Sequence, residues 1–165
     1  MSKAEEYLLE AFAGESQANR KYLAFAAKAE QEGHPQVARL FRAAAEAETV
    51  HAHSHLRAMG GIRSTPENLQ EAVSGETHEF RQMYPEMLKA AEAEGNSNAK
   101  RSFHYANEAE KVHAGLYQRL LDSLGVSKET YPYFVCPVCG HTTERRAPDA
   151  CPVCGTKGTM FKRID

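Results

Sequence analysis

The sequence predicts a mostly helical protein, in which a bundle of four long helices is followed by a small C-terminal domain of strands and loops. Three observations lead to this prediction. Ala, Glu and Leu dominate the first 125 residues, where hydrophobic residues recur with helical periodicity. From about Val126 the composition changes to Pro, Gly, Thr and Cys. Two Cys-Pro-Val-Cys-Gly segments follow, beginning at Cys136 and Cys151.

Glycine and proline residues divide the helical part into four segments. The expected helices cover roughly residues 3–32, 35–59, 65–95 and 97–123. The first ends at Gly33, and Pro35 suits the first position of the second helix because it needs no backbone donor there. The pair Tyr84-Pro85 interrupts the third segment and predicts a kink.

The length of 165 residues accommodates one bundle and a small appendix. We therefore expect three parts: a four-helix bundle over 1–124, a linker over 125–133 and a metal-binding domain over 134–165. The net charge of −2 gives no reason to expect nucleic acid or an anionic membrane as a partner.

The compartment can also be argued from the sequence. No apolar segment approaches the roughly 20 residues that cross a bilayer. The first twelve residues, MSKAEEYLLEAF, are charged and helical in pattern, unlike a secretory signal. We therefore expect a cytoplasmic protein with no membrane contact. In that reducing compartment, the four cysteines are expected to be metal ligands or redox thiols rather than disulfides.

Seven potential metal ligands interrupt the apolar stripes of the four helices. They are Glu15, Glu48, His51, Glu76, Glu79, Glu110 and His113. An ionised carboxylate in a helical core is costly unless something positive compensates it. Two of the helices carry the same Glu-x-x-His signature, at Glu48 and at Glu110. Several carboxylates and two imidazoles on inward faces together indicate a metal cluster.

The heights of these residues along the helices also agree. Glu15 lies about 18 residues before the turn near residue 33, and Glu48 lies about 15 residues after it, which is within about one helical turn. Around the turn near residue 95, Glu76 and Glu110 are placed in the same way. The two halves therefore repeat one design and bring their ligands into one layer.

One Glu from each of two helices, plus Glu-x-x-His from each of two others, is the dimetal site of ferritin-like bundles. Positions i and i+3 share a helix face, so Glu48 can bridge two metals while His51 binds one. Glutamates suit Fe(III) and imidazole suits Fe(II). The alternative is a solvated helix face, which a single Glu-x-x-His would favour; two matched copies favour metal.

The two cysteine segments form a second constellation. Each Cys-Pro-Val-Cys-Gly segment predicts a knuckle whose two thiolates face one ion, and the pair predicts a tetrahedral four-sulfur site. The spacing fits zinc and iron equally. Zinc would only hold the small domain together, whereas iron would also carry an electron. We expect His141, which follows the first knuckle, to be exposed rather than metal-bound.

These features together resemble the rubrerythrins, which join a ferritin-like di-iron bundle to a C-terminal rubredoxin-like domain. The resemblance covers nearly the whole chain, and the segments that carry it are AFAGESQANRKYL, EAETVHAH, SGETHEF, NEAEKVHAGLY and the two CPVCG knuckles. Rubrerythrins are similar to this chain in having Glu-x-x-Glu on the third helix, here Glu76 and Glu79. Ordinary ferritins lack this extra glutamate and the cysteine domain.

The resemblance implies a role for each ligand. Glu48 and Glu110 would bridge two irons. Glu15 and His51 would bind one iron, and Glu76 and His113 the other. Glu79 would be the extra carboxylate that exchanges with the second-helix histidine when the oxidation state changes. One further iron would be held by four thiolates, namely Cys136, Cys139, Cys151 and Cys154. Tyr22 fits a core position or a hydrogen bond to a ligand, and the resemblance suggests the latter.

The resemblance also implies an activity. The protein would be a non-haem di-iron peroxidase that reduces hydrogen peroxide to water in oxidative-stress defence. Electrons would pass through the four-cysteine iron from an NAD(P)H-linked rubredoxin reductase, with zinc as a possible substitute metal. Two alternatives stay open at this point: a ferroxidase or iron-handling bundle, and a non-enzymatic zinc-ribbon module that binds a partner.

The connection between the second and third helices is short. Ferritin-like bundles cross their full length at this point, but only about seven residues, 60–66, are present. Fully extended they reach roughly 24 Å, whereas a 25-residue helix is about 37 Å long. We therefore expect either a plain up-down-up-down bundle or, as the resemblance favours, a domain-swapped homodimer. In the dimer, residues 1–60 would pack with 66–124 of the partner.

Overall fold

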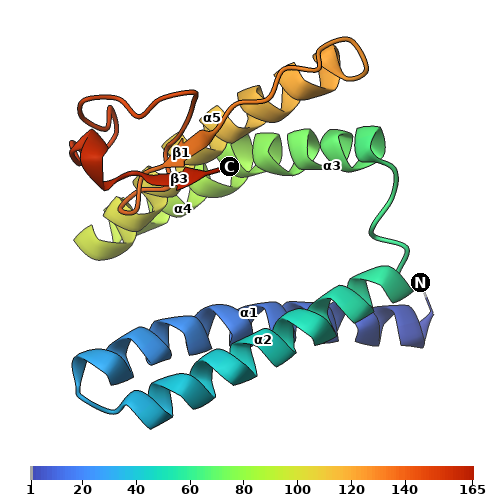
Figure 1. Ribbon diagram of the computed structural model, residues 1–165, viewed down its shortest axis with the longest axis vertical. Coiled ribbons are helices and arrows are strands. Elements are labelled where there is room, and N and C mark those ends of the chain that lie inside the picture. Colours follow the sequence, from blue (N-terminus) through green and yellow to red (C-terminus); the bar gives the residue numbers. More distant parts are fainter. Residues whose placement is uncertain (1) are drawn as a thin grey trace. The chain divides into compact units, whose positions relative to one another are not determined.

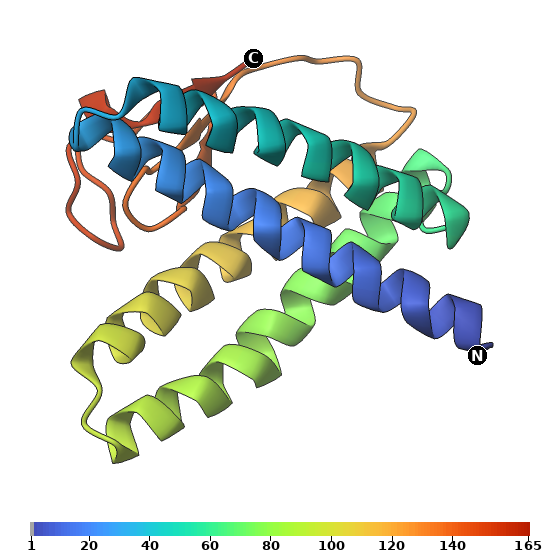
Figure 2. The same ribbon diagram turned by 90° about the horizontal axis from the view of Figure 1, so that it is seen from below.

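The computed structural model describes residues 2–165 (Figure 1). The chain forms two compact units, of which the first ends at Arg63 and the second extends from Ser64 to Asp165. In the first unit, α1 (Lys3–Gln31) and α2 (Pro35–Ala58) run side by side as an antiparallel hairpin, as Figures 1 and 2 both show. The Ser2 hydroxyl caps α1 by accepting from the backbone N–H of Glu5.

Alanines form the contact between α1 and α2. Ala26 and Ala38 are 2% and 0% exposed, and Ala29 packs with them. Small side chains at these positions let two helices approach closely. One polar side chain is buried in the same hairpin: Asn19 donates from Nδ2 to the carbonyl oxygen of Ala45 (2.6 Å) and to Oγ1 of Thr49 (2.8 Å). These two bonds tie α1 to α2 in one register.

Replacing Asn19 by alanine should destabilise the hairpin. The change Asn19→Ala removes both cross-helix hydrogen bonds and leaves a gap, so we expect the free energy of unfolding to fall by about 1–2 kcal/mol. Urea unfolding followed by circular dichroism measures the effect. Gln17→Ala, at an exposed position of the same helix, is the matched control. Equal stability of the two variants would contradict the register role of Asn19.

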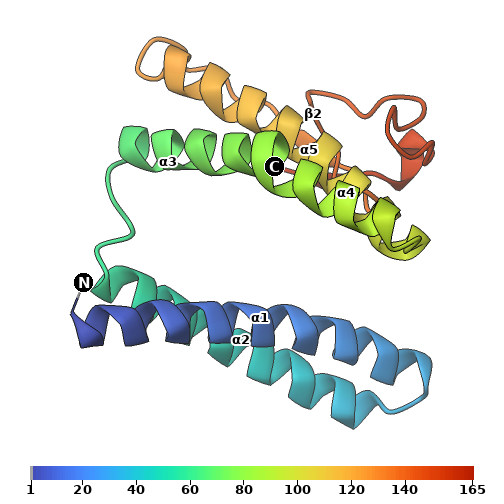
Figure 3. The same ribbon diagram turned by 180° about the vertical axis from the view of Figure 1, so that it is seen from behind.

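The second unit begins with one long helical segment and its antiparallel neighbour. The segment comprises α3 (Thr65–His78), a π-helical turn η1 (Glu79–Met83) and α4 (Tyr84–Ala93), which follow one another continuously in Figures 1 and 3. It packs along α5 (Ser97–Ser123). The sequence predicted that Tyr84-Pro85 interrupts this segment, and the π-helical turn ends directly before these two residues.

The missing N–H of Pro85 accounts for the irregular backbone hydrogen bonds between α3 and α4. Pro85 stands in the first turn of α4, where it interrupts the backbone hydrogen bonds of a continuous helix. The preceding N–H, of Tyr84, bonds to the carbonyl of Glu79, five residues back. Such π turns inside α-helices occur frequently at functional sites.

The end of the second unit is a small lobe of strands and knuckles. Its strands are β1 (Tyr133–Val135), β2 (Thr142–Glu144) and β3 (Lys162–Ile164), with a 3-10 turn η2 (Gly158–Met160) before the last. They form an antiparallel sheet in the order β2-β1-β3. The lobe core consists of cysteines and Phe161, and Tyr105 of α5 packs against it.

The predicted fold class, a helical protein with a small C-terminal strand and loop region, is confirmed. The predicted domain bounds and the swapped dimer stay predictions. The two compact units meet after Arg63 rather than after the fourth predicted helix. The cysteine lobe belongs to the second unit because it packs on α5. Within residues 2–165, no helix is both long and apolar enough to cross a membrane.

Candidate metal centres

The first unit contains one cluster of potential ligands. Glu15 on α1 faces Glu48 and His51 on α2, and one ligand atom of each lies within 4.8 Å of the others. Nδ1 of His51 is 2.9 Å from a carboxylate oxygen of Glu48 and 3.9 Å from one of Glu15. The Glu-x-x-His spacing places its two side chains on one face of α2. The His51 side chain is 54% exposed within the described structure.

The second unit repeats this arrangement. Glu76 on α3 faces Glu110 and His113 on α5, again within 4.8 Å. Nδ1 of His113 is 2.6 Å from Glu110 and 3.8 Å from Glu76. The His113 side chain is only 26% exposed. Six of the seven predicted ligands therefore form two triads of the same composition, one in each unit.

Electrostatics in the second triad suit a cation. Burial, together with a hydrogen bond to Glu110, raises the pKa of Glu76 to about 7. A hydrogen bond with His113 lowers the pKa of Glu110, and the same bond raises the pKa of His113. Two carboxylates this close need a positive charge between them. Their hard oxygens and the imidazole nitrogen are donors that suit both oxidation states of iron.

Glu79, the seventh predicted ligand, stands outside the triads. It begins the π-helical turn η1, and it is not among the residues whose ligand atoms converge with Glu76. Glu79 is still close enough to interact electrostatically with the triad: burial and the charge of Glu110 raise its pKa. Tyr84, at the other end of the turn, also has a raised pKa through burial and the charge of Glu79.

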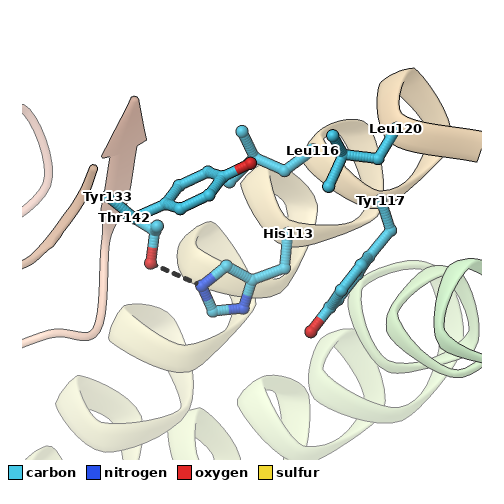
Figure 4. A pocket seen from close by; sticks show the side chains of 6 residues that line it. All are labelled: His113, Leu116, Tyr117, Leu120, Tyr133 and Thr142. Carbon is cyan, nitrogen blue, oxygen red and sulfur yellow. Dashed lines mark hydrogen bonds between the residues drawn. The ribbon is translucent and has the colours of Figure 1, made fainter. Parts of the chain in front are cut away.

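A cavity of about 230 Å³ lies beside His113 in the second unit (Figure 4). Its lining is mostly apolar and comprises His113, Leu116, Tyr117, Leu120, Tyr133 and Thr142. Across it, Nε2 of His113 lies 2.9 Å from Oγ1 of Thr142. Sequence reasoning did not identify Thr142, because its contact with His113 depends on how the lobe packs on α5. The motif offered no signal for it.

The four cysteines converge in the lobe. Sγ of Cys136 lies 3.5 Å from Sγ of Cys154, and Sγ of Cys139 lies 3.4 Å from Sγ of Cys151. These separations are too long for disulfides. Metal–sulfur bonds of about 2.3 Å put the corners of a tetrahedron about 3.8 Å apart. The cysteines are thus arranged for a single tetrahedral ion.

Glycine closes each knuckle. Gly140 and Gly155 have φ of +78° and +75°, a region that L side chains rarely adopt. The N–H of Gly140 donates to the carbonyl of Cys136, and the N–H of Gly155 donates to that of Cys151. These turns bring the two cysteines of each knuckle to the same ion.

The thiols differ in acidity. Burial raises the pKa of Cys139. Burial is the largest single effect and by itself would raise the pKa of Cys154, but hydrogen bonds from the side chain and backbone of Thr156 and from the neighbouring thiols together outweigh it and lower that pKa to about 6. A thiol of that acidity is readily available as a thiolate ligand near neutral pH.

The expectation that His141 is exposed was wrong. The residue is 9% exposed, and no described residue bonds its Nδ1. The turn at Gly140 brings the chain back toward the knuckle, where the carbonyl of His141 accepts from the N–H of Cys136 at 2.9 Å. That backbone bond holds His141 inside the lobe. Burial and the neighbouring His113 charge lower its pKa.

Tyr22 packs in an aromatic group within the first unit. Its ring centroid lies 5.9 Å from that of Phe41 and 6.4 Å from that of Phe25. This contact accounts for its place on the helical stripe. The hydrogen bond from Tyr22 to a ligand stays a prediction.

Comparisons with known proteins find relatives over nearly the whole chain. The family model described as rubrerythrin matches residues 6–121, and the one described as the rubredoxin-like domain of rubrerythrin matches residues 134–162. Rubrerythrin-2 of Clostridium acetobutylicum is 38% identical, over 95% of this chain and 94% of its own length. Rubrerythrin of Porphyromonas gingivalis is 34% identical, over 98% and 90%. A solved structure of fully reduced, all-ferrous nigerythrin is similar with a TM-score of 0.60 and 31% identity, over 99% of this chain and 88% of that one.

Proposed function

Because this chain belongs to the rubrerythrin family, and so carries a carboxylate–imidazole di-iron site and a four-cysteine iron site, we propose that it reduces hydrogen peroxide to water. The observation that carries this proposal is the presence of two matching Glu/Glu/His triads and a four-thiolate centre in one chain. Two irons held by the two triads suit a two-electron reaction, and a single iron held by four thiolates suits the transfer of one electron at a time. Removal of peroxide would make it an oxidative-stress enzyme.

We assign the ligands as follows. Glu48 and Glu110 would hold both irons, and each lies within its triad on the same helix face as a histidine. Glu15 and His51 complete one iron site. Glu76 and His113 complete the other. Glu79 would be the carboxylate that exchanges with His51: it lies near the second triad without joining it, and it belongs to the π turn, in which the backbone hydrogen bonds are irregular.

The reaction needs two electrons and two protons for each peroxide, and yields two waters. When bound, the two irons supply both electrons for cleavage of the O–O bond. The protein supplies the protons. Burial makes the carboxyl of Glu79 easier to protonate, so this group can hold a proton beside the site and release it to a departing oxygen. Tyr84 and Tyr117 both have raised pKa values because of burial and nearby carboxylates, so their hydroxyls stay protonated as hydrogen-bond donors.

Sustained turnover needs a supply of electrons. We propose that the four-cysteine iron receives them one at a time from an NAD(P)H-linked rubredoxin reductase. Zinc could fill the same tetrahedral site but has no redox chemistry. The lobe packs directly on α5, the helix of Glu110 and His113, which supports its role as the immediate donor.

We further propose that the active form is a homodimer with exchanged helix pairs. Helix α2 ends at Ala58 and α3 begins at Thr65, a gap that an extended chain spans by at most about 24 Å. A helix of the length of α2 measures about 36 Å. The ferritin-like connection, which runs the length of the bundle, cannot be made over this gap. Each di-iron site would therefore combine residues 1–60 of one chain with 66–124 of its partner.

Metal analysis tests the assignment of the two centres. Protein purified without oxygen should contain about three irons per chain, two in the bundle and one in the thiolate site. It should also be red, because ferric iron bound by four thiolates absorbs visible light. Elemental analysis and an absorption spectrum of one sample are sufficient. One zinc and no iron per chain would refute the peroxidase proposal in favour of a zinc-ribbon module.

A further inference from the structure

The two histidines of the triads differ in whether their second ring nitrogen, Nε2, has a hydrogen-bond partner. In the described part of its own unit, His51 engages its neighbours only through Nδ1. His113 uses both nitrogens: Nδ1 faces Glu110 at 2.6 Å, and Nε2 lies 2.9 Å from Oγ1 of Thr142 (Figure 4). Thr142 is the first residue of β2. The cysteine lobe therefore contacts a predicted iron ligand directly.

The direction of this hydrogen bond follows from the other bond of Thr142. Its hydroxyl lies 3.0 Å from the carbonyl oxygen of Gly140, to which it can only donate. A hydroxyl has one proton, so its oxygen accepts the proton on Nε2 of His113. A neutral imidazole carries one proton. With that proton on Nε2, the lone pair of Nδ1 is available to a metal ion, which would replace the hydrogen bond that Nδ1 makes to Glu110.

We propose that Thr142 is a positioning residue for the di-iron site, which holds His113 in the tautomer and orientation that present Nδ1 to iron. The inference rests on the proposed di-iron function and deepens it. A histidine ligand commonly donates its free N–H to a protein acceptor, and loss of that acceptor weakens metal binding by about 10–100-fold. His113 has such an acceptor from the lobe, whereas the described residues of the first unit offer none to the His51 ring.

The packing around Thr142 makes it a well-placed acceptor. Gly140 lies next to Ala109 of α5: a Cβ added to this glycine would be 3.7 Å from the Ala109 side chain, which is an ordinary van der Waals distance. The knuckle therefore lies against α5. At the other end of β2, the guanidinium of Arg119 lies 2.6 Å from the carboxylate of Glu144. Both ends of the segment that carries Thr142 are thus held on the helix of His113.

Cobalt binding to the full-length chain tests the proposal. Co²⁺ in the thiolate site gives an intense charge-transfer absorption, while Co²⁺ in the carboxylate–imidazole site is measured by chelator competition. For Thr142→Val, which keeps the shape and removes the hydroxyl, we expect affinity at the carboxylate–imidazole site to fall about tenfold or more. Thr142→Ser keeps the hydroxyl and should bind like the parent protein. The thiolate absorption should be unchanged in both, which shows that the lobe is intact.

The neighbouring threonine provides a matched control. The Thr143 hydroxyl donates to the carbonyl of Arg146 at an exposed position, so Thr143→Val should leave cobalt affinity unchanged. A second measurement reports the bond itself: in zinc-loaded protein, the His113 Nε2 proton should exchange with water faster in Thr142→Val than in Thr142→Ser.

The outcomes separate this inference from the proposed function. Equal cobalt affinity in Thr142→Val and the parent protein, or equal losses in the valine and serine variants, would overturn the positioning role. The predicted cobalt pattern in a protein that does not reduce peroxide would support the positioning role and refute the peroxidase proposal. A parent chain that binds cobalt only at the cysteines would overturn both.

Discussion

Serine at position 139 should stop reductase-driven turnover while sparing one round of peroxide reduction. Cys139 is 6% exposed and completes the four-thiolate site. The variant Cys139→Ser leaves three thiolates and a hard oxygen, which is a poor ligand for this centre. The triads lie on the helices and keep all their ligands. Reduced variant protein should therefore oxidise once on addition of peroxide, and should not be reduced again.

Two measurements on the same sample check this result. Stopped-flow absorption of chemically reduced protein follows the single oxidation, and NADPH consumption with a rubredoxin reductase follows repeated turnover. Val138→Ala is the matched control, because Val138 lies in the same knuckle and is 58% exposed. Comparable repeated turnover by Cys139→Ser and the control would contradict the electron-supply role of the lobe.

A zinc-loaded lobe separates electron supply from folding. Parent protein with zinc at the four cysteines and iron in the bundle keeps the tetrahedral site intact, but zinc cannot change oxidation state. It should show the same loss of repeated turnover as Cys139→Ser. Retained turnover in this form would show that electrons reach the di-iron site without passing through the lobe.

Two inactive variants should restore one working site when they share a swapped dimer. In the first variant, Glu48→Ala damages the ligand set of the first unit. In the second, Glu110→Ala damages that of the second unit. If units are exchanged, the mixed dimer has one site that lacks both glutamates and one site with every native ligand. We therefore expect half the di-iron content and half the peroxidase activity of the parent dimer.

Co-expression with two different affinity tags yields the mixed dimer for iron analysis and activity assay. The control pairs Glu48→Ala with Glu15→Ala, which lie in the same unit. In an exchanged dimer, this pair damages both sites and restores nothing. If each chain builds its own site, the Glu48→Ala and Glu110→Ala mixture would also restore nothing, and helix exchange would be refuted.

The triads were predictable from the sequence because their geometry depends only on helical spacing and on distances from the turn that joins two neighbouring helices. The Glu-x-x-His spacing alone places Glu110 and His113 on one face of a helix. Equal distances from the turn at residue 95 place Glu76 opposite them. The structure has these three residues together. The cysteine knuckles were predictable for the same reason, since each is formed within five consecutive residues.

Features that depend on packing between segments were not predictable. Tyr84-Pro85 indicated where the third helix would be interrupted, but it did not indicate that the five preceding residues, Glu79–Met83, would form a π turn. The backbone hydrogen bonds before a proline can be rearranged in several ways, and the packing of this segment along α5 favours the π turn. Similarly, His141 follows a knuckle and was expected to be exposed, but a backbone bond to Cys136 holds it inside the lobe.

The sequence by itself determined which side chains could bind metal, because helical periodicity and knuckle spacing are properties of short segments. Only the tertiary structure decided which residue of the cysteine lobe contacts a predicted ligand on the helices. Thr142 and His113 are 29 positions apart, and no periodicity relates a strand residue to a helix residue at that distance. Their hydrogen bond exists because the knuckle of Gly140 packs on α5, and this packing depends on the shapes of both surfaces together.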